Sequence, residues 1–137
     1  MSLFVDTSVW YAAADSSDAD NSFAKAALLS GESLVTTDHV LIEAWSLIHH
    51  RIGTHAAKRF WEVIRDGAAS VEIVGAGDLN AAWQIGEEFP DQDFSIVDRT
   101  SFAVMRRVSL TRVASLDSDF AIFRFGAGKR HAFTIIR

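Results

Sequence analysis

Residues 3–10, LFVDTSVW, join a short apolar run to the polar triplet Asp6-Thr7-Ser8. The run from Leu3 to Val5 predicts a buried strand, and the triplet carries the carboxylate and hydroxyl groups that commonly begin a helix. We therefore expect Asp6 at the carboxyl end of a first strand. As an alternative, Asp6 only caps the following helix, although Ser8 can also serve as that cap.

Outward from this stretch, strand and helix patterns alternate along the chain. Further strands are predicted from short apolar runs at residues 33–36, 71–74 and 113–116, with a last edge strand at 131–136. Helices are predicted from periodicity and capping residues at 19–29, 37–51, 54–65, 78–88 and 95–108. This alternation predicts an α/β fold with a mainly parallel sheet of about five strands, helices on both faces, and sites beyond the carboxyl ends of the strands. No repeat or linker divides the chain, so we expect one domain over residues 1–137.

The composition limits the chemistry that the chain can perform. The 137 residues suit one core, and 49% hydrophobic with 23% charged residues is ordinary for a globular protein. The absence of cysteine excludes disulfides, zinc-thiolate sites, iron-sulfur clusters and a cysteine nucleophile. The start MSLFVDTSVW lacks a basic leader, and no run approaches the roughly 18 apolar residues of a membrane span. We therefore expect a cytoplasmic protein.

Four acids, Asp6, Glu43, Asp98 and Asp117, each stand beside or inside an apolar segment. A carboxylate against apolar surface is costly unless another group pairs with it. A parallel sheet would bring these positions to one cleft, where a shared divalent cation would neutralise them. Mg²⁺ and Mn²⁺ prefer carboxylate oxygen, so the acids predict a site for one of these ions.

Each acid also has a purely structural interpretation. Glu43 lies on an apolar helix face and could form a buried salt bridge. Asp98 follows Ser95 by three residues, the spacing of a capping box. Asp117 and Asp119 could cap the short segment that follows them. The expected convergence of the four acids favours the metal site over these separate roles.

The charge is unevenly distributed along the chain. Residues 1–98 carry 5 Lys and Arg against 16 Asp and Glu, a net charge of −11, whereas residues 99–137 carry 8 against 2, a net charge of +6. The basic part predicts a phosphate-facing surface, with scattered solvated charges as the alternative. Its cations are Arg99, Arg106, Arg107, Arg112, Arg124, Lys129, Arg130 and Arg137.

Four stretches make the chain resemble the PIN-domain nucleases, specifically the VapC-type toxin ribonucleases of bacterial toxin-antitoxin pairs. They are FVDTSVW (4–10), HVLIEAWSLI (39–48), DFSIVDRTSFAVMRR (93–107) and VASLDSDF (113–120). The resemblance covers essentially the whole chain. It implies that Asp6, Glu43, Asp98 and Asp117 form the acidic catalytic site that binds Mg²⁺ or Mn²⁺.

The same resemblance implies metal-dependent hydrolysis of RNA by a growth-inhibiting toxin. It further implies that Thr7 or Ser8 orients a carboxylate or a metal-bound water, and that Asp119 lies in the outer shell, where some relatives carry His. The expected partners are the RNA substrate, a cognate antitoxin that lays a segment across the site, and a second copy of the chain. A housekeeping RNA-maturation nuclease, a non-catalytic interaction module and a phosphomonoesterase are the alternative functions.

The large aromatic side chains have two interpretations. We expect them mainly in the core, with an antitoxin-binding groove as the alternative. They are Trp10, Tyr11, Trp45, Trp61 and Trp83.

Overall fold

A parallel sheet lies at the centre of the computed structural model, which describes residues 1–137. Its five strands lie in the order β3-β2-β1-β4-β5, and all four pairings are parallel. The strands are β1 (Ser2–Val5), β2 (Ser33–Thr37), β3 (Ser70–Glu72), β4 (Arg112–Ala114) and β5 (Thr134–Ile136). The prediction of a mainly parallel sheet with an edge strand at the carboxyl terminus is therefore confirmed.

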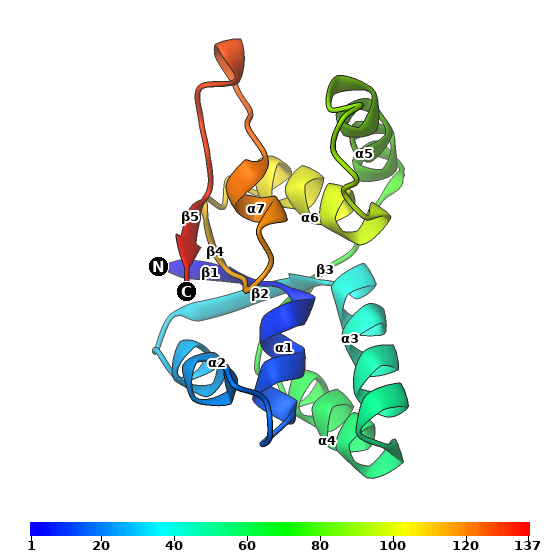
Figure 1. Cartoon of the computed structure of the whole chain (residues 1–137), viewed down its shortest axis with the longest axis vertical. Helices are drawn as coiled ribbons and strands as arrows, with labels where there is room; N and C mark the ends of the chain where they lie inside the picture. Colours follow the sequence, from blue (N-terminus) through cyan, green and yellow to red (C-terminus); the bar gives the residue numbers. More distant parts are fainter.

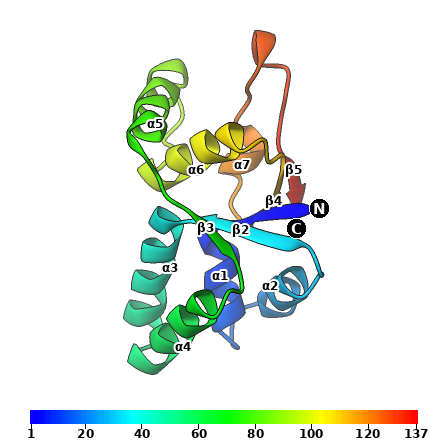
Figure 2. The ribbon, with the colours of Figure 1, turned by 180° about the vertical axis from the view of Figure 1, so that it is seen from behind.

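Helices cover both faces of the sheet (Figures 1 and 2). One layer contains α1 (Thr7–Ala14), α2 (Asn21–Leu28), α3 (Asp38–Arg51) and α4 (Thr54–Arg65). The other contains α5 (Ala76–Glu88), α6 (Ile96–Arg107) and α7 (Asp119–Ile122), followed by a short 3₁₀ turn, η1 (Ala127–Lys129). The predicted α/β class is confirmed. No helix is long and apolar enough to cross a membrane.

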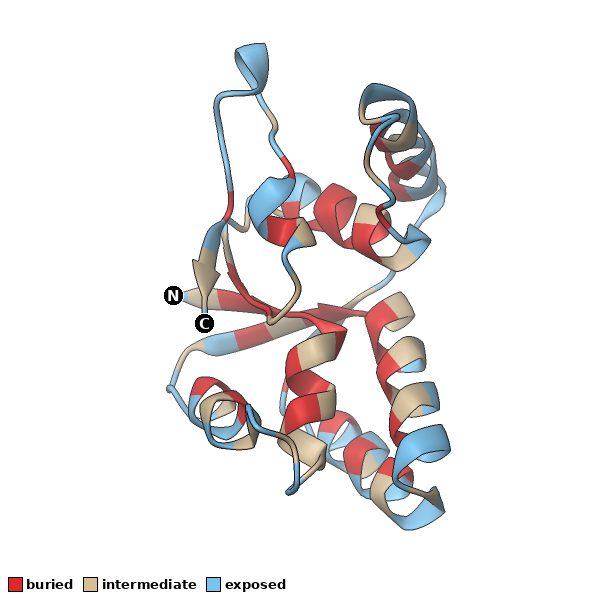
Figure 3. Cartoon of the chain, viewed as in Figure 1, coloured by how far each residue is buried: buried red, intermediate tan, exposed pale blue.

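A cluster of phenylalanines packs α6 and α7 together on their side of the sheet. Phe102 is fully buried, stacks on Phe123 at 4.4 Å between ring centroids, and meets Phe120 edge-on at 5.0 Å. Such contacts add stability beyond area burial. Figure 3 shows that the buried residues of α6 and α7 face inward. Because Phe102 lies one turn after Asp98, and Phe120 follows Asp119, this packing fixes the two helix starts that carry acids.

The strand preceding Asp117 is shorter than its apolar sequence predicts. β4 ends at Ala114, whereas the pattern predicts a strand to residue 116. The backbone N–H of Leu116 donates to the Ser8 hydroxyl at 3.0 Å and not to a neighbouring strand. The chain therefore leaves the sheet early and turns toward α1, and the single-turn helix α7 follows, which the sequence did not predict.

The aromatic prediction is only partly correct. Trp10 is buried, and Tyr11 and Trp45 are half-buried against the core. Trp61 and Trp83 are 46% and 66% exposed, so their assignment to the core is wrong. Their helices, α4 and α5, bury other faces against the molecule, which leaves these side chains in solvent.

Candidate metal centre

Asp6 follows β1 directly and is buried at the start of α1. Its carboxylate makes no capping bond to the helix, so the simple capping interpretation is wrong. Instead Oδ2 accepts hydrogen bonds from the hydroxyls of Ser8 and Ser115, both at 2.9 Å. The pKa of Asp6 is raised to about 6 because burial outweighs the two hydroxyl hydrogen bonds, which stabilise the ionised form. Asp6 is thus held in one orientation by neutral donors alone.

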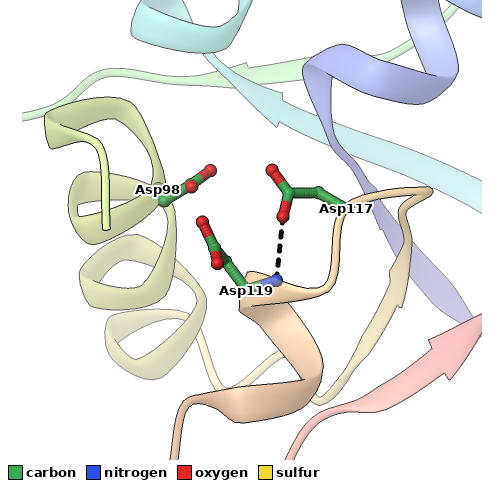
Figure 4. A group of neighbouring side chains, drawn as sticks. All are labelled: Asp98, Asp117 and Asp119. Atoms are coloured by element: carbon green, nitrogen blue, oxygen red, sulfur yellow. Dashed lines mark hydrogen bonds between the residues drawn. The ribbon is translucent and has the colours of Figure 1, made fainter. Parts of the chain in front are cut away.

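Asp98 lies in the first turn of α6 and is buried. Its backbone N–H donates to Ser95 Oγ at 3.0 Å, which satisfies the helix start as the capping pattern predicts. The carboxyl group itself does not complete a capping box but faces two other acids, Asp117 and Asp119 (Figure 4). The residue therefore combines a structural role of its backbone with a carboxyl group turned toward other acids.

Asp98, Asp117 and Asp119 bring one oxygen each to within 4.8 Å of one another. Figure 4 shows their side chains pointing toward a common centre from α6 and from the loop that starts α7. The Asp119 N–H donates to Asp117 Oδ1 at 2.8 Å, and the Asp117 N–H donates to Ser115 Oγ at 3.0 Å. These bonds fix the loop so that both carboxylates turn toward α6.

The electrostatics of this group favour a cation. The pKa of Asp98 is raised to about 8, first by burial, then by a hydrogen bond with Asp119 and by the negative charges of Asp6, Asp117 and Asp119. Asp78 shows the opposite behaviour, because the Arg107 guanidinium bonds it at 2.9 and 3.1 Å and lowers its pKa. The acidic group has no such internal cation. A cation from outside the chain is therefore needed to balance its negative charge.

The other predicted site residues lie at different places. Glu43 is half-buried on α3 and is not part of the close group. It follows His39 by one turn, and the His39 ring lies 3.4 Å from Thr100 of α6, so α3 flanks the acids. The Thr7 hydroxyl is buried without a hydrogen-bond partner, whereas Ser8 bonds Asp6 directly. Among the hydroxyl candidates, only Ser8 contacts an acid.

Sequence reasoning missed Ser115. Its hydroxyl donates to Asp6 and accepts from the backbone of Asp117, so one side chain joins the acid after β1 to the acid after β4. The signal available was a hydroxyl residue two positions before Asp117, at the end of a predicted strand. Parallel neighbours such as β1 and β4 end side by side, which makes that position a natural bridge.

The donor set fits a hard divalent cation. Mg²⁺ and Mn²⁺ prefer carboxylate oxygens as ligands. The close group offers three carboxylates with oxygens within 4.8 Å of one another, and it contains no cysteine or histidine. The pKa values of Asp6 and Asp98 are raised mainly by burial and further by the negative charges of neighbouring acids. A cation would relieve the repulsion between them.

Comparison with known proteins identifies the family. The model of the PIN domain matches residues 3–126, most of the chain and all four predicted acids. The chain belongs to the PIN-domain family. It is 36% identical to the 23S rRNA-specific endonuclease VapC20 of Mycobacterium tuberculosis over 124 residues, which are 90% of this chain and 95% of that protein. It is 26% identical to the ribonuclease VapC26 of the same organism over 136 residues, 98% of this chain and 99% of that protein.

Solved PIN-domain structures agree with this assignment. The crystal structure of Mycobacterium tuberculosis VapC20, described as a sarcin-ricin loop cleaving toxin, has a TM-score of 0.83 and 34% identity, covering 88% of this chain and 93% of that one. A chain of VapBC2 from Rickettsia felis has a TM-score of 0.68 at 9% identity over 89% of this chain and 92% of that one. A chain of a toxin-antitoxin complex from Klebsiella pneumoniae has a TM-score of 0.65 at 12% identity, covering 85% of this chain and 88% of that one. The last two show the fold alone, whereas VapC20 confirms the predicted resemblance to VapC-type ribonucleases.

Proposed function

We propose that the protein is a metal-dependent endoribonuclease and the toxin of a toxin-antitoxin pair, with Asp6, Asp98, Asp117 and Asp119 as the centre of its active site. The observation that carries the proposal is the group of three carboxylates within 4.8 Å, with Asp6 beside it and no internal cation to balance it. Glu43 stays a predicted site residue at the α3 edge. Asp119 lies close enough to act as a ligand, although the sequence suggested an outer role for it.

The acids would hold Mg²⁺ or Mn²⁺. When bound, such an ion activates water and stabilises negative charge on phosphate oxygens. Residues of the chain hold the acids in place. Ser8 and Ser115 orient Asp6, and the backbone N–H of Asp119 orients Asp117. Without an ion the acids would repel a phosphodiester, so we expect cleavage to depend on metal.

The identity to VapC20 supports a large-subunit rRNA substrate, since that relative is a 23S rRNA-specific endonuclease. We propose that the chain cleaves the sarcin-ricin loop and that a cognate antitoxin restrains it in the cytoplasm. We also propose a homodimer. The exposed apolar side chains Leu79 and Trp83, one turn apart on α5, support a face that a second copy would cover.

Cleavage of purified ribosomes by antitoxin-free protein tests this proposal. With Mg²⁺ or Mn²⁺ we expect one defined fragment from the large-subunit rRNA, lost on addition of EDTA and in Asp98→Asn. Asp66→Asn makes the same chemical change at an exposed position on the opposite layer and should keep full activity. Equal cleavage by Asp98→Asn would refute the assignment of the site.

The same experiment separates the alternatives. A non-catalytic module would leave rRNA intact with every metal, and a phosphomonoesterase would hydrolyse small phosphate esters instead. A housekeeping nuclease would cut RNA but would not arrest growth when expressed alone. Growth arrest that Asp98→Asn abolishes supports the toxin assignment.

A further inference from the structure

The segment after α7 forms an ordered basic projection, which we call the basic arm (residues 123–131). Phe125 and His131 exchange two backbone hydrogen bonds, both at 3.0 Å, which close the arm at its base. Phe123 is buried at its start, and Phe133 is buried just beyond its end. Figure 1 shows the arm standing away from the sheet on the same side as α5. The arm is therefore anchored at both ends.

A cavity of about 610 Å³ lies between the basic arm, α5 and α6. Three cations line it, Arg106 from α6 and Arg124 and Lys129 from the arm, against a single acid, Glu88. The polar side chains Asn80 and Gln84 of α5 also line it. The cavity thus offers hydrogen-bond donors and positive charge in an otherwise acidic protein.

These cations are not engaged with carboxylates. Arg106 lies 4.6 Å from the Phe125 ring centroid, Lys129 lies 4.6 Å from that of Phe89, and Arg124 bonds backbone carbonyls at the end of α7. None of the three forms a salt bridge. After Asp119 the chain carries four Lys or Arg and no acid, so nothing near in sequence neutralises the arm. Such uncompensated charge is the footprint of a phosphate-binding surface.

The cavity lies along the same helix as the acids. Asp98 is in the first turn of α6 and Arg106 in its last, a separation of eight residues or roughly 12 Å at 1.5 Å per residue. The cations are thus placed to meet phosphates a few nucleotides from a bond held at the acids.

We propose that the basic arm and its cavity bind the phosphate backbone of the RNA substrate beside the cleaved bond, with Arg106 and Lys129 of the cavity and the exposed Arg130 of the arm as the contacting cations. This proposal rests on the proposed ribonuclease function. The half-exposed Phe125 ring, already paired with Arg106, offers a surface on which a base can stack. The arm would thereby favour structured RNA over short fragments.

Binding, measured apart from cleavage, tests the arm. The protein carries Asp98→Asn so that no RNA is cut, and the probe is a fluorescein-labelled RNA stem-loop with the sarcin-ricin loop sequence, followed by fluorescence anisotropy. Lys129→Gln with Arg130→Gln removes two exposed arm charges. Lys58→Gln with Arg59→Gln removes two exposed charges from α4 on the opposite layer and is the matched control.

We expect the arm variant to bind roughly tenfold more weakly than the control, with a salt dependence shallower by about 0.7 to 0.9 for each lost phosphate contact. The charge-conserving double variant Lys129→Arg with Arg130→Lys should bind RNA as tightly as the control. Equal affinity and equal salt dependence in arm and control variants would overturn the proposal. Because binding needs no turnover, the result is independent of whether the acids cleave RNA.

Discussion

Replacing Asp98 with Asn removes a carboxyl group that the fold crowds against other acids, and we expect the metal-free protein to become more stable. The pKa of this group rises from its ordinary 3.8 to about 8 in the folded chain. Each pH unit between 3.8 and pH 7 costs roughly 1.4 kcal/mol of folding free energy, about 4 kcal/mol in all. Asn keeps the shape and avoids this cost. We therefore expect the free energy of unfolding of the metal-free protein to rise by about 2–4 kcal/mol at pH 7. The lower bound allows for relaxation around the site.

The stability of the metal-free wild-type protein should fall as the pH rises. A raised folded pKa means that the folded state holds more protons than the unfolded state between pH 4 and pH 8, so stability falls as pH rises through that range. Asp6, with a pKa of about 6, contributes in the same direction up to pH 6. The difference between wild type and Asp98→Asn should vanish near pH 4 and reach its maximum above pH 8. Mg²⁺ should reduce the difference, because binding stabilises only the wild-type site.

Urea denaturation in EDTA at pH 4, 6, 7 and 9 measures this difference in the free energy of unfolding. Asp66→Asn, at an exposed position, serves as the control and should leave stability unchanged at every pH. If Asp98→Asn shows no gain at pH 7, or a gain that is the same at all pH values, then the carboxyl group is not electrostatically crowded and the reasoning is refuted.

Three further predictions concern the support of the site. Ser115→Ala should weaken Mg²⁺ binding about 10- to 100-fold, because it frees Asp6 from one of its two hydroxyl donors; an unchanged calorimetric affinity would contradict this role. Mg²⁺ affinity should rise between pH 6 and pH 8 with release of protons from Asp6 and Asp98, which calorimetry in buffers of different ionisation heat detects; pH-independent binding would argue against the raised pKa values. Phe102→Ala should cost about 3–5 kcal/mol of unfolding free energy, and a loss below 1 kcal/mol would show that the phenylalanine cluster does not hold α6 and α7 together.

The sequence predicted the elements that local patterns specify. The apolar runs gave the strands, and Asp6 was correctly expected at the end of β1 because the apolar run from Leu3 to Val5 stops there. The position of Asp98 followed from the cap at Ser95 and its helix register. Local pattern therefore identified the sheet and correctly placed Asp6 and Asp98.

The features that the sequence did not predict depend on contacts between residues far apart in the chain. Ser115 bonds Asp6 across 109 positions, so no local pattern indicates that partnership. The early end of β4 likewise depends on Ser8, 108 positions away from Leu116. Trp83 was assigned to the core from its hydrophobicity alone, but helix rotation and packing decide which face meets solvent.

Crystals grown with Mn²⁺ test most directly whether Asp98, Asp117 and Asp119, with Asp6 beside them, hold a divalent cation. Anomalous scattering should show an Mn²⁺ peak between these carboxylates in the wild-type protein and none in Asp98→Asn crystals grown in the same way. A wild-type crystal without that peak, from protein that cleaves rRNA in the same Mn²⁺ concentration, would contradict the account.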